Sequence, residues 1–174
     1  MRRYIHFRLF TGLLAVVLFW AVILLPTPSR LLAGASKASA PGIVVRSDSE
    51  SFYLAKINQL RTDKGLASLV IDSRLSLSAS QKTNDMISQH YWDHYAPNGT
   101  AFSDYIWRDS PKASRVGENL AKCFDTEQAA FDALVASPTH YAIMVGMFTN
   151  FGVYEASDPA SGCIYTTMHF SYYN

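Results

Sequence analysis

An apolar segment close to the N-terminus limits how this chain can fold more than any other feature of its sequence. Residues 9–25 are apolar apart from Thr11 and Gly12, three arginines precede them, and Pro26 and Pro28 follow them. Because a positively charged flank stays in the cytoplasm, the residues that follow the apolar segment are expected outside the cytoplasm. A signal-peptide core has about 7–15 residues and a spanning helix about 20, so a run of 17 residues fits either. We therefore expect residues 1–25 to form a hydrophobic helix, either a cleaved signal peptide or a transmembrane signal anchor.

The remaining sequence divides into a linker and one domain. Residues 26–47 are rich in Pro, Ser, Ala and Gly, which is typical of a linker. Two small-residue stretches in them, Ala33-Gly34-Ala35 and Ala38-Ser39-Ala40, resemble signal-peptide cleavage sites. Residues 48–174 have the length of one domain. We expect this domain to be extracytoplasmic, either secreted or held at the cell membrane by residues 9–25.

The charge of the chain argues against nucleic acid as a partner. The sequence has 15 Lys and Arg residues and 14 Asp and Glu residues, which gives a formal net charge of +1. Beyond Arg8 the basic residues are scattered, whereas phosphate binding needs them clustered. We expect no nucleic-acid binding.

The two cysteines, Cys123 and Cys163, both follow the apolar segment. Outside the cytoplasm, two thiols that meet usually oxidise. The two cysteines are 40 positions apart, and a disulfide that closes a loop of this length stabilises a domain by about 3–4 kcal/mol in the chain-entropy model. We predict this disulfide, and two separate buried thiols are the alternative.

Helical and strand patterns occupy different parts of residues 48–174. Periodicity and capping residues predict helices over 47–64, from Asp72 or Ser73 onward, over 126–136 and over 138–145. A short helical turn is expected within 100–108, and a loop over 110–117. Aromatic and β-branched residues over 151–154 and 163–170 predict two antiparallel strands. Helices followed by a terminal hairpin predict a layered α+β domain.

Three ionisable residues are candidates for chemistry: His94, Glu118 and His140. Two imidazoles and a carboxylate can bind a divalent metal ion, and the same groups can transfer protons near neutral pH. Their wide spacing does not by itself show that they meet in the fold. His169 lies in a predicted strand, where a packed or surface position is expected.

Several short segments occur in an order that is typical of one family. They are Ile57-Asn58-Gln59-Leu60-Arg61 with Lys64-Gly65-Leu66-Ala67-Ser68-Leu69, the helix start at 75–79, His94-Tyr95-Ala96-Pro97-Asn98-Gly99, Gly117-Glu118-Asn119-Leu120, Ser137-Pro138-Thr139-His140 and Phe151-Gly152-Val153. Each is a modest signal, but their joint order and spacing are specific. Together they resemble the CAP superfamily in its bacterial form, also called SCP-like or cysteine-rich secretory protein/antigen 5/pathogenesis-related-1 domains.

The resemblance implies a three-layer α-β-α sandwich with a small antiparallel sheet. It also implies a cleft in which His94, Glu118 and His140 converge, where some family members bind zinc or another divalent metal ion. The implied metal ligands are His94 and His140, with Glu118 orienting an imidazole. The chain has Ser137 where many eukaryotic members have a second glutamate, and this weakens the hypothesis of a hydrolase.

Two functions are compatible with the sequence. One is a binding module at the cell envelope, with a metal-capable cleft for a small molecule, lipid, peptide or cell-wall component. The other is a metal-dependent peptide or ester hydrolase with His94, Glu118 and His140 as catalytic candidates. We prefer the first because one carboxylate is missing and no Gly-x-Ser-x-Gly or Cys–His motif is present. Eight aromatic residues from Tyr141 to Tyr173 are expected in the core or, alternatively, along an apolar groove for a lipid or sterol.

Overall fold

The structure is a computed structural model that describes residues 48–174. The signal peptide or membrane anchor predicted for residues 1–25 and the linker predicted for 26–47 lie outside the described residues. Within residues 48–174, none of the helices has the length and apolar character needed to cross a bilayer.

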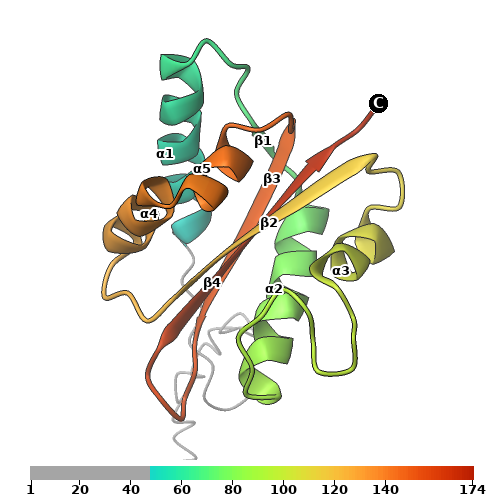
Figure 1. The fold of residues 1–174 in the computed structure, drawn as a ribbon, viewed down its shortest axis with the longest axis vertical. Coiled ribbons are helices and arrows are strands. Elements are labelled where there is room, and N and C mark those ends of the chain that lie inside the picture. Colours follow the sequence, from blue (N-terminus) through green and yellow to red (C-terminus); the bar gives the residue numbers. More distant parts are fainter. Residues whose placement is uncertain (1–47) are drawn as a thin grey trace, which may run out of the picture. The chain divides into compact units, whose positions relative to one another are not determined.

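A four-stranded sheet forms the middle layer of the described residues (Figure 1). The elements in chain order are α1 (Ser49–Asp63), β1 (Val70–Ile71), α2 (Ser73–Ser88), α3 (Phe102–Asp109), β2 (Arg115–Lys122), α4 (Glu127–Ala136), α5 (Pro138–Met144), β3 (Asn150–Ser157) and β4 (Ile164–Tyr172). The strand order is β1-β3-β4-β2, with β3–β4 and β4–β2 antiparallel and the short β1 parallel to β3. Helices α1, α4 and α5 cover one face, and α2 and α3 the other (Figure 1). The predicted sandwich is confirmed, with β1 as one added parallel edge strand.

Helix ends lie where local signals predict them. The Asp72 carboxylate accepts a hydrogen bond from the Arg74 N–H and caps α2, and the Thr126 hydroxyl accepts one from the Ala129 N–H and caps α4. Gly65, just past the end of α1, has a φ of +69°, which glycine adopts without strain.

Strand β2 corrects one prediction. The sequence predicts a loop over 110–117, whereas β2 begins at Arg115 and continues to Lys122. The start of the strand is not recognisable in the sequence because the strand lacks the usual alternation of apolar and polar residues. It contains the buried polar residues Glu118 and Asn119 and the small residues Gly117 and Ala121.

Each face of the sheet has its own cluster of buried apolar side chains. The larger includes Tyr53, Phe151 and Phe170, and the smaller joins Met86 of α2 to Leu120 of β2. Seven of the eight aromatic residues from Tyr141 to Tyr173 belong to these clusters or pack against them, whereas the Tyr173 hydroxyl group donates a hydrogen bond to Asp72 outside both clusters.

Cys123 and Cys163 form the predicted disulfide. The bridge joins the residue after β2 to the residue before β4, with the two Cα atoms 4.4 Å apart. It therefore fastens one end of the edge strand to its neighbour.

Candidate functional site

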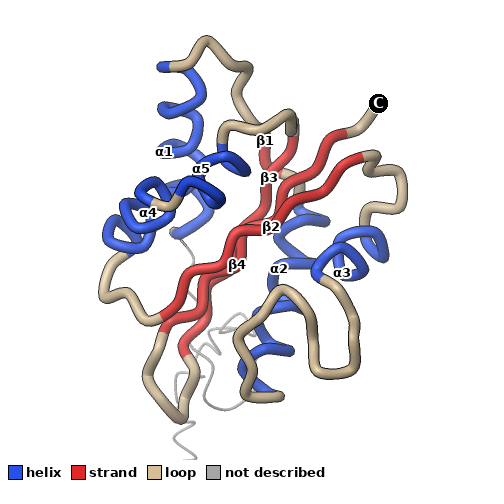
Figure 2. Tube along the Cα trace, in the orientation of Figure 1, coloured by secondary structure: helices blue, strands red, loops and turns tan. Residues whose placement is uncertain are grey.

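The three candidate residues come from three separate elements and line one cavity. His94 lies in the long segment between α2 and α3 (Figure 2), Glu118 on β2, and His140 on α5. The cavity has a volume of about 360 Å³, and Phe102, Thr139 and Ile143 also line it. The structure thus brings together residues that are up to 46 positions apart in the sequence.

This cavity crosses the open edge of the sheet. Strand β2 is an edge strand, and its side chains alternate between the two faces. Glu118 contacts His169 on the α2 face, whereas Asn119 donates a hydrogen bond of 2.9 Å to the His140 carbonyl group on the α5 face. The edge strand therefore contacts His94 and His169 through Glu118 and the main chain of His140 through Asn119, on opposite faces of the sheet.

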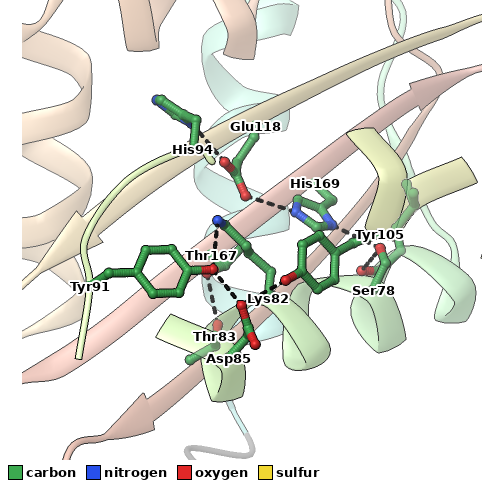
Figure 3. A network of polar contacts seen from close by, with 11 residues as sticks. Ser78, Lys82, Thr83, Asp85, Tyr91, His94, Tyr105, Glu118, Thr167 and His169 are labelled. Carbon is green, nitrogen blue, oxygen red and sulfur yellow. Dashed lines mark hydrogen bonds and ion pairs between the residues drawn. The ribbon is translucent and has the colours of Figure 1, made fainter. Parts of the chain in front are cut away.

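Glu118 is the hub of a buried polar network (Figure 3). Its side chain is fully buried, and its two oxygens accept separate hydrogen bonds, from His94 Nδ1 at 2.6 Å and from His169 Nε2 at 3.0 Å. Burial alone would raise the pKa of Glu118, but the hydrogen bonds from His169 and His94 lower it below its usual value. Glu118 is therefore ionised at neutral pH, and both imidazoles act as donors to it.

His169 is a member of this network that sequence reasoning missed. Its side chain is fully buried, its Nδ1 lies 2.8 Å from Ser78 Oγ of α2, and it stands directly opposite Glu118 in the β2–β4 register. The sequence predicts only that it is packed or on the surface. The alternation of Thr167, His169 and Ser171 along β4 is the signal that one face of this strand carries polar groups.

The pKa values of the two cavity imidazoles are shifted in opposite directions. The hydrogen bond to Glu118 raises the pKa of His94. Burial, and then the nearby charge of His94, lower the pKa of His140. His140 Nδ1 lies 2.8 Å from Ser137 Oγ. In both rings Nδ1 is therefore engaged, and Nε2 is the nitrogen left for a ligand.

The described residues that line this cavity could offer a metal ion two histidine nitrogens, from His94 and His140. No group of three or more His, Cys, Asp or Glu side chains within residues 48–174 is arranged to hold a metal ion. Both Glu118 oxygens are occupied by imidazoles, which is the role of a carboxylate that orients a metal-binding histidine. A metal ion in this cavity would therefore have two protein nitrogens, with solvent or ligand completing its coordination.

A buried lysine lies beside the carboxylate hub. Lys82 of α2 is fully buried and donates a hydrogen bond of 3.1 Å to the Tyr91 hydroxyl group, while Tyr91 and Tyr105 both donate to Asp85 (Figure 3). Burial lowers the pKa of Lys82, and the negative charges of Glu118 and Asp85 oppose this shift. Lys82 thus lies close to Glu118 with the Tyr91 hydroxyl group as its hydrogen-bond partner, an arrangement that no sequence pattern indicated.

Comparisons with known proteins agree with the fold. Residues 54–170 match the model of the family described as "CAP: Cysteine-rich secretory protein family". The chain is 33% identical over 132 residues to the Bacillus subtilis (strain 168) protein YkwD, a match that covers 73% of this chain and 51% of YkwD. The chain thus spans about half the length of that relative.

Two solved structures share the architecture. An outer surface protein from Borrelia burgdorferi matches with a TM-score of 0.70 and 17% identity, covering 76% of this chain and 98% of that one. An extracellular protein containing an SCP domain from Bacillus anthracis str. Ames matches with a TM-score of 0.62 and 22% identity, covering 71% and 40%. At these identities the likeness supports the fold alone. The family match over most of the chain shows that this protein belongs to the cysteine-rich secretory protein (CAP) family.

Proposed function

We propose that this protein is an extracellular binding module whose cleft holds a divalent metal ion, such as zinc, through Nε2 of His94 and Nε2 of His140. One observation carries the proposal. Both histidines line one cavity, and the Nδ1 atom of each is engaged by a hydrogen-bond partner, Glu118 for one and Ser137 for the other. When Nδ1 of each ring carries the proton and donates to its partner, the neutral ring has a lone pair on Nε2 for a metal ion in this cavity.

Three observations support a place outside the cytoplasm. The apolar segment at residues 9–25 has the charge pattern of an export signal or anchor. Cys123 and Cys163 are bonded, and disulfides persist in oxidising compartments. Two proteins of similar fold are described as outer-surface and extracellular. The protein would then work at the cell envelope, secreted or held at the membrane.

Binding is preferred to hydrolysis because Glu118 is the one carboxylate among the described residues that line the cavity, and both of its oxygens are already engaged. A general base must direct a lone pair toward the proton that it removes. Glu118 has a fully buried side chain whose two oxygens already accept hydrogen bonds, and Ser137 occupies the position of a second acid. Peptide or ester hydrolysis that is lost in Glu118→Gln without loss of folding would overturn this preference.

Zinc titration of the purified full chain in detergent tests the proposal. We expect saturable binding of one zinc ion, at least tenfold weakening in His94→Ala and in His140→Ala, and no binding in the double variant. The matched control is His90→Asn, because His90 is exposed, lies outside the cavity and has a φ of +55° that Asn tolerates. Equal binding by the wild type and the double variant would contradict the metal site.

A further inference from the structure

Strand β2 has one row of main-chain groups without a partner strand. The hydrogen bond of 2.8 Å from the Cys123 N–H to the Ile164 carbonyl fixes the phase of the β2–β4 ladder. In antiparallel pairs, hydrogen-bonded positions alternate, so odd-numbered residues from Arg115 to Ala121 direct their main-chain groups toward β4. The even-numbered residues direct theirs toward the open edge: Val116, Glu118, Leu120 and Lys122. Within residues 48–174 no hydrogen bond to these outward groups is formed by a neighbouring segment.

Two cavities lie end to end along this edge. The first contains the His94 and His140 site and is lined by residues 116–119 of β2. The second has a volume of about 300 Å³ and is lined by residues 120–122 of β2, together with Trp92, Phe124 and Leu134. His140 lines both cavities. Residues 116–122 of β2 therefore line two adjoining cavities along most of the open edge, and we call the two cavities together the groove.

Residues 117–121 of β2 are all buried, and the little of Glu118 that is exposed is main chain rather than side chain. Glu118 as a whole residue is 5% exposed, whereas its side chain is 0% exposed. The exposure that remains therefore belongs to the main-chain atoms. A ligand that reaches them must pair with an alternating row of N–H and C=O groups at the bottom of a groove, which is what an extended peptide does and a lipid tail does not.

One end of the groove carries a cation that has no carboxylate partner in the described residues. Lys122 Nζ lies 5.2 Å from the centroid of the Trp92 ring and 5.3 Å from that of Tyr165, and the ion pairs within residues 48–174 do not include it. Beside it, Leu120, Phe124 and Leu134 provide an apolar wall. This end suits an acidic group next to apolar side chains.

We propose that the groove binds an extended peptide, which adds to the sheet as a strand alongside β2 with apolar side chains near Phe124 and a carboxylate near Lys122. The proposal deepens the proposed function, on which it rests for the role of the cleft as a ligand site. From Val116 to Lys122 the edge has a length of about 20 Å at about 3.3 Å per residue, which a peptide of six to eight residues spans. Such a peptide would enter the cavity that His94 and His140 line.

Peptide analogues with blocked amide groups test this mode of binding. The probe is a library of acetylated, amidated octapeptides with one fixed Asp and variable Val, Leu, Phe and Thr positions, bound to the full chain in detergent. The tightest peptide is then N-methylated at its odd-numbered or at its even-numbered residues. Because only alternate amides of an added strand face β2, we expect one analogue to lose at least about tenfold in affinity and the other to retain it.

Measurements on the protein locate the peptide. Amide hydrogen exchange followed by NMR should slow at Val116, Glu118 and Leu120 on peptide binding, because their N–H groups gain acceptors. Lys122→Glu should weaken binding at least about fivefold, whereas the matched control Lys112→Glu, at an exposed lysine outside both cavities, should not.

Several outcomes would overturn the strand-addition proposal. They are equal effects of both N-methylated analogues, no library member that binds below about 1 mM, and protection of the edge amides by self-association without peptide. Each titration is run with zinc and with EDTA. If one N-methylated analogue binds more weakly than the other but zinc does not bind, the metal site is refuted and the peptide groove stands. If zinc binds but no peptide does, the peptide groove is refuted and the metal site stands.

Discussion

The substitution Glu118→Gln tests whether the buried carboxylate holds the site together. Glutamine has nearly the same shape but no charge, and its carbonyl oxygen can replace only one of the two oxygens that accept from His94 and His169. The amide NH₂ group that replaces the other oxygen faces an imidazole N–H. That imidazole must change its tautomer or lose its hydrogen bond.

The expected loss of stability follows from these contacts. Two hydrogen bonds to a charged group contribute about 1.5–3 kcal/mol each, and the neutral bond that glutamine retains contributes about 1 kcal/mol. Removing the charge also removes the cost of burying it, which offsets part of the loss. We therefore expect Glu118→Gln to lower the free energy of unfolding by about 2–3 kcal/mol, measured by urea unfolding followed with far-UV circular dichroism.

The difference in the free energy of unfolding between the wild type and Glu118→Gln should depend on pH in a defined way. The folded pKa of Glu118 is lowered, so its stabilisation is complete above its unfolded pKa of about 4.3 and is lost as the pH falls through the folded value. The folded pKa of His94 is raised, so its contribution is complete below about 6.5 and is lost as the pH rises through the folded value. The wild type should therefore exceed Glu118→Gln by the largest margin between about pH 5 and about pH 6.5.

A second buried glutamate is the matched control. Glu155 is 1% exposed, and one of its oxygens accepts from the Tyr53 and Thr166 hydroxyl groups, while Oε2 has no hydrogen-bond partner in the described residues. Glu155→Gln can retain both hydroxyl contacts, so we expect a change within about 1 kcal/mol. Equal losses for the two variants, or a difference for Glu118→Gln that is constant from acid to neutral pH, would refute the reasoning.

Three further changes test the fold that positions the site. Replacing Cys123 and Cys163 with serine should lower stability by about 3–4 kcal/mol through the released loop of 40 residues, as measured by the melting temperature with and without reductant. Gly152→Ala should cost about 3 kcal/mol in urea unfolding, because its Cβ would lie 2.2 Å from the main-chain nitrogen of Ser76 where α2 crosses β3. Arg61→Met should cost about 3 kcal/mol or more in the same assay, because the guanidinium group donates to four main-chain carbonyl groups and is 3% exposed.

The parts of this fold that depend on local signals were predictable from the sequence. Asp72 and Thr126 cap helices, Gly65 ends one and Pro138 begins one, and each effect involves residues within a turn of one another. The order of the family segments, in turn, implied the sandwich and the three candidate residues. The two-residue β1 was not predicted, because only its pairing with β3 distinguishes it from a loop.

The contacts that complete the site depend on tertiary packing and were not predictable. Lys82 lies on α2 in a sequence that gives no reason to bury it, and its place is set by Tyr91 and Asp85, which meet only after the following loop returns to the helix. His169 is polar within an aromatic strand, and its partner Glu118 is 51 residues away in the sequence. Neither pairing has a local signature.

The segment Gly117-Glu118-Asn119-Leu120 shows how one strand register determines the whole site. At Gly117 a Cβ would lie 2.8 Å from the Phe148 ring, and Asn119 binds α5, so the odd positions require close contact with one helical layer. Glu118 and Leu120 turn to α2 on the other face. A shift of β2 by one residue would place Glu118 against Phe148 and remove it from both histidines. The same shift would exchange the rows of main-chain groups, so the register that orients His94 also decides which amides line the open groove.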